Sequence, residues 1–578
     1  MTPAQGRAEA RWSALAGPGA IAPDMRRILR RVFPKPAARS TPSRPPPAAP
    51  PKPMAPLAPA EAARFARAYH DRTRHFPARY ARALGFMDWD SQPDPFRRWE
   101  GAPRVLLPIP TGPGAAYEAA FVEGLLPAAP VDLAGIGALF YDSLALSAWK
   151  EAGDARWALR VNPSSGNLHP TEGWLVAGPI AGLCDEPAVY HYDPREHALE
   201  RRAVLAEGPP PGVVLVALSS VPWREAWKYG ERAFRYCQHD AGHALAGVAI
   251  AAAGLGWRTR LLEGPTDDQV AALLGLRDRE GEEAEHPELI LAVGPDAAEV
   301  ALPAPPDAHV GVANRLSEAH HDWPIIADVE LATRKQAGAG RWEEWQRPPR
   351  AFAVGDSDLR LRGIVRQRRS AVSMDGKSGL TLAAFQQVLA KVLPGQEQVP
   401  FSAMSGPPLV DLLLWVHRVA DLTPGLYALV RDGDRLERLR AALDPAFSWE
   451  QRSPLPLYLL REGDVRNLAA GTSCGQDIAA DGVFAAAMLA DLGAIDRHGA
   501  DLYRRLHWEA GAIGQQLYLE AEASGVRATG IGCFFDEESG RCFGLRDQDL
   551  RVIYHFTVGG PVDDERLRTV DAYAERGA

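Results

Sequence analysis

Hydrophobic and polar positions along residues 60–319 predict a mixture of helices and strands. Apolar residues recur at helical spacing over 61–84, which predicts a surface helix, and again over Leu133–Trp149. Glu231–Gly254 predicts a long helix whose alanines and glycines require close packing against another element. AVYHYDPREHALERR predicts a hairpin that turns at Asp193–Pro194. Three apolar runs predict buried strands: Gly173–Gly178, Val213–Ser220 and Leu289–Gly294.

A polar stretch, Asn162–Glu172 (NPSSGNLHPTE), interrupts this pattern. Its proline, serines, glycine and asparagine predict a tight loop that brings backbone N–H groups and hydroxyls to one point. Such loops suit an anion or the polar rim of a planar cofactor. A plain turn of the same composition is the alternative interpretation.

The second half of the chain repeats the first. Ala241–Arg258 aligns without a gap on Ala510–Arg527, and Lys228–Gly230 falls in the same register on Arg497–Gly499. AVYHYDPREHALERR likewise resembles GLYALVRDGDRLERLR, and LAVGP resembles FTVGGP. Matched segments in the same order indicate duplication. A duplicated domain with a helix of small residues can pack on its copy as subunits do in a two-fold dimer.

A chain of 578 residues is too long for one ordinary domain, so two or more are expected. Residues 1–58, dense in alanine and proline, predict a disordered or polyproline-like tail with one short helix near Met25–Val32. We expect a first domain over 59–319, a linker over 320–350 and a second domain over 351–578.

Composition and charge exclude several classes of function. The net charge is −9 and no basic stripe with interleaved aromatics appears, which argues against nucleic acid as a partner. The sequence contains no run of about 18 apolar residues, so no membrane span is predicted. The five cysteines form no CxxC pair, so a disulfide framework or structural zinc site is not expected. A cytoplasmic setting follows as the default. His239 and His243 have metal-ligand spacing but no evident third ligand, so no metal is predicted.

Two further clusters could carry chemistry. Arg368, Arg369 and Ser370 combine two guanidiniums with a hydroxyl and could clamp a phosphate, although a surface helix with arginines is the alternative. Lys228 and Tyr229 precede the long helix and could be a proton-transfer pair if burial lowers the pKa of the lysine. A lysine that reaches solvent beside a packed tyrosine is the alternative. A redox pair of Cys533 and Cys542 is conceivable, but buried thiols are the simpler interpretation.

Together PSSGNLHPTE, YHYDP, WKYGERAFRY and the DAGH helix resemble the nitroreductase superfamily, and within it the SagB-type azoline dehydrogenases. RQRRSAV resembles the family's FMN-phosphate motif, RATGIGCFF the glycine turn over the flavin, and ERLRT the basic segment that closes on the phosphate. The resemblance implies an α+β fold of two tandem nitroreductase-like three-layer α-β-α domains that form an intramolecular pseudo-dimer.

The family binds FMN at a dimer interface, with the arginine–serine motif from one subunit and the serine–glycine–asparagine loop from the other. Here each half has only part of that set, so the resemblance implies one FMN per chain. Its implied ligands are Pro163, Ser164, Ser165, Gly166, Asn167, Arg368, Arg369, Ser370, Gly530, Gly532, Arg566 and Arg568. Lys228 and Tyr229 match the pair that removes a substrate proton in the azoline dehydrogenases, and Arg497–His498 replaces it in the second half.

The implied function is an FMN-dependent oxidoreductase that oxidises a C–N or C–C bond of a small-molecule or peptide-derived substrate. One alternative is an NAD(P)H-dependent nitro or quinone reductase, and another is a non-catalytic flavin carrier or scaffold. His169 stands where the branch usually has tyrosine, and its role stays open. No peptide-clamp segment is recognisable.

Overall fold

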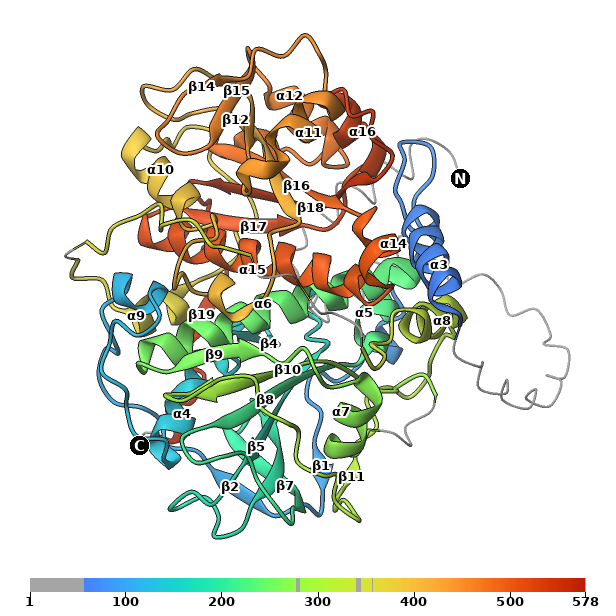
Figure 1. The fold of residues 1–578 in the computed structure, drawn as a ribbon, viewed down its shortest axis with the longest axis vertical. Helices are drawn as coiled ribbons and strands as arrows, with labels where there is room; N and C mark the ends of the chain where they lie inside the picture. Colours follow the sequence, from blue (N-terminus) through green and yellow to red (C-terminus); the bar gives the residue numbers. More distant parts are fainter. Residues whose placement is uncertain (1–56, 277–280, 339–341, 343–344, 356, 577–578) are drawn as a thin grey trace, which may run out of the picture.

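The computed structural model describes residues 57–276, 281–338, 342, 345–355 and 357–576 (Figure 1). Most of the predicted tail, including the helix expected near Met25–Val32, lies outside these residues. The described chain forms two antiparallel seven-stranded sheets, one below and one above a central layer of helices in Figure 1. This arrangement is the α+β fold predicted from the sequence.

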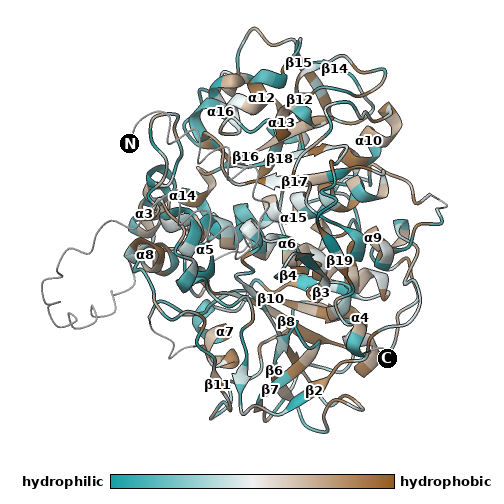
Figure 2. Ribbon diagram, turned by 180° about the vertical axis from the view of Figure 1, so that it is seen from behind, coloured by the Kyte–Doolittle hydropathy of each residue, from teal (hydrophilic) through white to brown (hydrophobic). Residues whose placement is uncertain are grey.

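The two sheets have corresponding strand orders, β2-β7-β6-β5-β8-β10-β9 and β14-β15-β13-β12-β16-β18-β17. Each has its fourth and fifth strands buried along their whole length, and for β5 and β8 of the first sheet the apolar runs predicted this. The hydrophobic colours of Figure 2 accordingly concentrate in the strands. The first sheet consists of β2 (Arg104–Leu106), β5 (Thr171–Ala177), β6 (Ala188–Asp193), β7 (Ala198–Val204), β8 (Val214–Ser220), β9 (Arg258–Leu261) and β10 (His286–Gly294). The second consists of β12 (Val410–Val416), β13 (Gly425–Leu429), β14 (Glu450–Gln451), β15 (Leu457–Glu462), β16 (Phe484–Asp491), β17 (Arg527–Ile531) and β18 (Leu550–Gly559).

Two helices of equal length, α6 (Ala233–Gly254) and α15 (Leu502–Ala523), pack on each other between the sheets (Figure 1). A Cβ on Gly242 would lie 2.2 Å from the backbone oxygen of Trp508, and one on Gly511 would lie 2.2 Å from that of His239. Only glycine permits so close an approach of two helix backbones. The small residues that the sequence placed on this helix therefore form the crossing point.

The contacts across this crossing are reciprocal. Arg235 on α6 pairs with Asp536 of the second half at 2.9 Å. Arg504, the counterpart of Arg235 on α15, pairs with Asp267 of the first half. Contact of residue i with j and of j with i is the signature of two-fold packing. The largest hydrophobic core cluster also contains residues of both halves, among them Ala246 and Ile513.

The remaining helices surround these layers. They are α3 (Pro59–Arg72), α4 (Leu133–Tyr141), α5 (Pro222–Tyr229), α7 (Asp267–Leu274), α8 (Pro324–Ala332), α9 (Leu361–Gln367), α10 (Leu382–Ala390), α11 (Leu436–Ala442), α12 (Arg466–Thr472), α13 (Ile478–Asp481), α14 (Ala494–His498) and α16 (Asp536–Cys542). A two-stranded sheet pairs β1 (Trp99–Glu100) with β11 (Val312–Ala313). No helix of the described residues is long and apolar enough to cross a membrane.

Several local predictions were wrong. The helix expected over Leu133–Trp149 ends at Tyr141, and β3 (Leu146–Ala152) begins five residues later. β3 lies between β4 (Ala155–Arg160) and β19 (Arg568–Val570) in a three-stranded sheet, so it forms a hairpin with the adjacent β4 and also pairs with the distant C-terminal segment. The helix expected over 61–84 ends at Arg72.

The segment GLYALVRDGDRLERLR forms β13 followed by α11, and not the hairpin of its first-half counterpart, because β13 takes β15 as its neighbour. The predicted hairpin of β6 and β7 is confirmed.

Candidate active site

The loop that follows β4 folds back sharply. Gly166, Asn167 and His169 have φ angles of 61°, 58° and 55°, a left-handed conformation that glycine adopts freely and asparagine tolerates. The Asn167 side-chain amide donates to the backbone oxygen of Ala158 at 3.0 Å, and the His169 backbone N–H donates to the Ser164 hydroxyl at 2.8 Å. Burial lowers the pKa of His169 well below its usual value, so its ring is neutral.

Asp240 of α6 holds this loop, and the sequence interpretation missed it. Its carboxylate accepts from the Ser165 backbone N–H at 3.1 Å and from the Ser165 hydroxyl at 3.0 Å. Burial raises the pKa of Asp240 to about 7, although hydrogen bonds from Ser164 and Ser165 act in the opposite direction. The signal was present in the DAGH motif, whose first residue is this aspartate.

Arg368 from the second half lies directly against the base of the loop. Its guanidinium donates to the backbone oxygens of Arg160 and Val161 at 3.0 and 3.2 Å, and it lies 4.9 Å from the ring centre of Tyr518. Pro163 is two residues beyond Val161. The structure therefore brings one of the two predicted arginines to the predicted loop, from the opposite half of the chain.

Arg369 and Ser370 extend this contact along the second half. The Ser370 hydroxyl bonds the Tyr518 hydroxyl at 2.8 Å, which also accepts from the Gly530 backbone N–H at 3.1 Å. The Arg369 guanidinium approaches the Ser147 hydroxyl at 3.4 Å. Burial lowers the pKa of Arg369 to about 10, and its neighbour Arg368 adds to this effect. Tyr518 thus connects Ser370 to Gly530. No sequence motif predicted this role.

A third cation lies close to this cluster. Burial lowers the pKa of Lys150 on β3, and the charges of Arg369 and Arg527 lower it further. Like charges held this near one another favour an anion between them. Lys150 was not predicted, because its position depends on the pairing of β3 with the C-terminal β19.

Lys228 and Tyr229 stand at the end of α5, above the loop. A Cβ on Gly166 would lie 2.6 Å from the Tyr229 hydroxyl, and the Tyr229 and Tyr236 rings are 4.6 Å apart. Burial lowers the pKa of Lys228, partly opposed by the Glu225 carboxyl. Burial raises the pKa of Tyr229 well above its usual value, so the phenol stays neutral.

The glycine-rich segment was expected to be a turn, but Gly530 lies within strand β17. Its pairing with Phe556 on β18 determines that conformation. The Gly532 backbone oxygen, one residue beyond the strand, accepts from the Tyr236 hydroxyl at 3.0 Å. A Cβ on Gly530 would meet the Tyr554 hydroxyl at 2.2 Å, so both glycines face tyrosine side chains that leave no room for a larger residue.

Arg566 and Arg568 are not joined to the other groups by the contacts of the described residues. The Arg566 guanidinium is exposed and pairs with Asp564 at 2.6 Å, and that of Arg568 pairs with Glu151 at 2.5 Å on the edge of β3. Exposed pairs of this kind contribute little to stability. The remaining predicted residues therefore come together around Tyr518, Tyr229 and Tyr236, while these two arginines lie on the surface.

The cluster has the hydrogen-bond donors and the glycines that a phosphorylated planar cofactor requires. Arginines, a lysine, serine hydroxyls and backbone N–H groups offer hydrogen bonds to phosphate and to a polar ring edge. Because Gly166, Gly530 and Gly532 lack a Cβ, the side chains of Tyr229, Tyr554 and Tyr236 approach their backbones closely. In the described part of the chain, no group of three or more histidine, cysteine, aspartate or glutamate residues could hold a metal ion.

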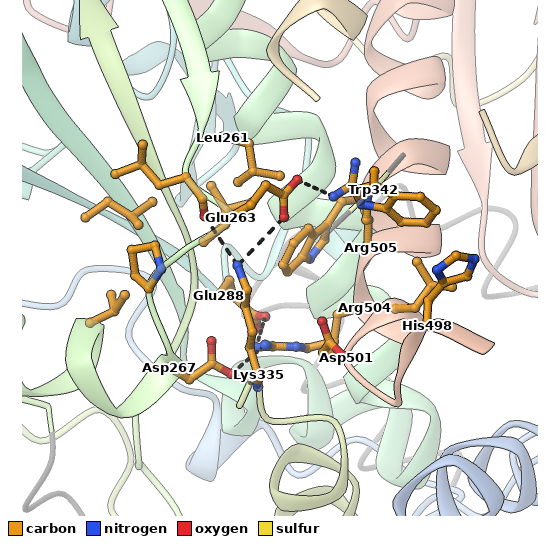
Figure 3. Close-up of a pocket in the computed structure, with 17 residues that line it drawn as sticks. Leu261, Glu263, Asp267, Glu288, Lys335, Trp342, His498, Asp501, Arg504 and Arg505 are labelled. Carbon is orange, nitrogen blue, oxygen red and sulfur yellow. Dashed lines mark hydrogen bonds and ion pairs between the residues drawn. The ribbon is translucent and has the colours of Figure 1, made fainter. Parts of the chain in front are cut away.

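A cavity of about 30 Å³ lies elsewhere, on the opposite side of the crossing of α6 and α15 (Figure 3). In the register that aligns the two helices, it is the counterpart of the cluster just described. Leu261 and Glu263 replace Gly530 and Gly532, His498 replaces Tyr229, and Arg505 replaces Tyr236. A space of this size holds only a few water molecules.

Charged and aromatic side chains fill the rest of this counterpart. Glu263 pairs with Arg505 and, at 3.7 Å, with Lys335 from the segment between the two halves (Figure 3). The Trp342 ring, from the same segment, stacks on His498 with 4.6 Å between ring centres. A Cβ on Gly406 would lie 2.6 Å from Trp342, so the tryptophan covers this glycine as Tyr229 covers Gly166.

Comparisons with known proteins agree with this architecture. Residues 150–295 match the model of the nitroreductase family. A putative nitroreductase from Anabaena variabilis is 22% identical, with a TM-score of 0.64 over 86% of this chain and 99% of that one. No curated protein matches.

Two other solved structures are less similar. The Escherichia coli microcin synthetase McbBCD complex with truncated pro-MccB17 bound is 19% identical over 41% of this chain and 94% of that one, with a TM-score of 0.25. A putative nitroreductase from Exiguobacterium sibiricum in complex with FMN is 14% identical over 35% and 88%, with a TM-score of 0.21. The chain thus has the fold of that putative nitroreductase, and residues 150–295 within its first half match the nitroreductase family model.

Proposed function

We propose that this protein is an FMN-dependent oxidoreductase of the SagB type, which oxidises a C–N or C–C bond of a small-molecule or peptide-derived substrate. The observation that carries the proposal is the contact of Arg368, from the other half of the chain, with the backbone oxygens of Arg160 and Val161 at the base of the loop. The nitroreductase family domain and fold support an oxidoreductase.

Each half supplies a different part of the proposed site. Lys150, Arg368 and Arg369 would hold the FMN phosphate, together with the Ser370 hydroxyl. The loop at Ser164–Asn167 would bind the polar edge of the ring, since Asp240 fixes its hydroxyl and backbone N–H groups. FMN, when bound, would supply the two-electron acceptor of the reaction.

Lys228 is proposed as the base. Burial lowers the pKa of its ammonium group and raises the fraction of neutral amine that can take a proton from the substrate. The neutral Tyr229 phenol would donate a hydrogen bond to the substrate and position it beside Lys228. Tyr236 anchors the Gly532 backbone oxygen and thereby keeps the second half in place against α6.

We further propose a single FMN per chain, within an intramolecular pseudo-dimer. On the opposite side, the backbone N–H of Thr259 donates to the Glu123 carboxylate at 3.3 Å. Thr259 is the counterpart of Ala528, which instead pairs with Ser370 beside the two arginines. There the Glu123 carboxylate, which also pairs with Arg260 at 2.6 Å, takes the backbone donor that a phosphate would need.

The test is the flavin content of the full-length protein after incubation with excess FMN and removal of the unbound fraction. We expect one FMN per polypeptide and bleaching of its visible absorbance by dithionite. Two FMN per polypeptide would contradict the single-site proposal, and a colourless protein would contradict flavin binding altogether.

A further inference from the structure

Two cysteines meet at the edge of the proposed site. The sulfur atoms of Cys474 and Cys533 are 2.9 Å apart, and each side chain is partly exposed. A disulfide bond is about 2.0 Å long, so the sulfurs need to approach by only about 0.9 Å to form one. The sequence interpretation considered Cys533 with Cys542 instead, but the Cys542 sulfur accepts from the Trp415 indole at 3.3 Å.

The backbone holds the two cysteines together. Cys474 follows α12 in a left-handed conformation with φ of 56°, which a residue with a side chain adopts only when its surroundings enforce it. The Gln476 side-chain amide donates to the Cys533 backbone oxygen at 2.9 Å and to that of Ser473 at 2.8 Å. The Phe535 backbone N–H donates to the Thr472 oxygen at 2.8 Å. These bonds connect the two segments on both sides of the sulfur pair.

The surroundings favour a thiolate on one of the two sulfurs. The hydrogen bond shared with Cys474 lowers the pKa of Cys533, and the Arg232 guanidinium adds to this effect. The same hydrogen bond, together with burial, raises the pKa of Cys474. Cys533 is therefore the attacking thiol and Cys474 the resolving one.

We propose that Cys474 and Cys533 are a reversible dithiol–disulfide site that reacts with small-molecule disulfides. The Cys533 thiolate attacks a disulfide RSSR, which forms a mixed disulfide and releases one RS⁻. Cys474 then loses its proton and attacks the Cys533 sulfur, which releases the second RS⁻ and leaves the intramolecular disulfide. The substrate disulfide gains two electrons and becomes two thiols, and the protein dithiol loses the same two electrons.

The cysteine pair lies directly beside the proposed flavin site. Cys533 follows Gly532, whose backbone oxygen accepts from Tyr236 at 3.0 Å and from Arg232 at 3.2 Å. A bond between Cys533 and Cys474 ties this segment to the one that follows α12. The exchange itself does not depend on flavin, so it can be tested whether or not FMN binds.

The experiment treats the full-length protein with oxidised and reduced glutathione in varied ratio, blocks free thiols by alkylation and maps the cysteines by mass spectrometry. We expect a Cys474–Cys533 disulfide that disappears with excess reduced glutathione, while Cys184, Cys237 and Cys542 are alkylated. Wild-type protein in which Cys474 and Cys533 stay free, or carry glutathione without joining, would overturn the proposal.

Variants assign the two roles. In Cys474→Ser the mixed disulfide on Cys533 has no resolving thiol, so one glutathione per chain should remain attached. Cys533→Ser should leave Cys474 unmodified, and Cys542→Ser, the matched control, should keep the wild-type disulfide. An unmodified Cys533 in the Cys474→Ser protein would contradict its role as the attacking thiol. The wild-type measurement decides the proposal even if a variant fails to fold.

Discussion

The proposed site and its counterpart across the crossing of α6 and α15 lie on corresponding elements of the two halves but differ in their side chains. On one side Tyr236 contacts the bare backbone of Gly532. On the other, Arg505 pairs with the Glu263 carboxylate (Figure 3). Trp342 there covers Gly406. At the first place tyrosine side chains lie against glycine backbone, whereas at the second a charge pair and an indole ring occupy the space.

The comparison separates the features that the two halves share from those in which they differ. The reciprocal ion pairs of Arg235 with Asp536 and of Arg504 with Asp267 occur on both sides, because they hold the two halves together. Residues that would contact a ligand differ between the sides. Packing of a fold and recognition by a site therefore impose separate requirements on the sequence.

The largest expected effect comes from removing the proposed base. Lys228→Ala should lower the rate of oxidation of a thiazoline test substrate by about 10² to 10⁴-fold, since general bases contribute about that much. Its FMN content should stay unchanged. The matched control is Arg497→Ala, which alters the equivalent position of the other half, where the guanidinium pairs with Asp491 at 3.0 Å.

Steady-state kinetics of the two variants decide this point. Equal loss of activity in both would contradict the asymmetry of the sites. NAD(P)H oxidation that persists in Lys228→Ala, without any thiazoline oxidation by the wild type, would favour the nitro or quinone reductase alternative, which needs no protein base.

Removal of an arginine at the meeting point of the two halves should weaken FMN binding. A hydrogen bond from a charged group contributes about 1.5–3 kcal/mol, so Arg368→Gln should raise the Kd for FMN by roughly 10 to 100-fold. Quenching of FMN fluorescence measures this change. Arg260→Gln is the control, because Arg260 pairs with Glu123 on the opposite side at 2.6 Å. An unchanged Kd in Arg368→Gln would place FMN elsewhere.

The pH dependence of stability should reveal Asp240. Its pKa is raised from 3.8 to about 7 in the folded protein, so it contributes stability that is complete below pH 3.8 and lost as the pH rises through 7. Between pH 5 and 8 this loss amounts to about 3 kcal/mol. Asp240→Asn cannot ionise, so its unfolding temperature should fall less over that range than that of the wild type. Parallel curves for the two proteins would show that Asp240 does not titrate as described.

The smallest effect is expected at the counterpart. Glu263→Gly restores a glycine at the position of Gly532, but Trp342 and the Glu123 carboxylate remain in place. The FMN content should therefore stay at one per chain, with at most a modest loss of thermal stability from the broken pair with Arg505. A second bound FMN would show that Glu263 alone blocks the counterpart.

The sequence alone determined the elements whose pattern is local and strong. The apolar runs predicted strands β5, β8 and β10, and alanine and glycine spacing predicted α6. The polar stretch Asn162–Glu172 predicted the loop of the candidate site, because proline, glycine and asparagine set the backbone conformation within a few residues. These features depend on neighbours in the chain, which a single sequence displays directly.

Only the tertiary structure decided which distant residues meet. The Asp240 contact with Ser165, the Tyr518 bridge between Ser370 and Gly530, and the Cys474–Cys533 pair all join separate segments. Part of the helix predicted over Leu133–Trp149 is instead strand β3, which pairs with both β4 and the distant β19. Such contacts depend on how whole elements pack, and packing energy outweighs the small local preferences that a sequence pattern records.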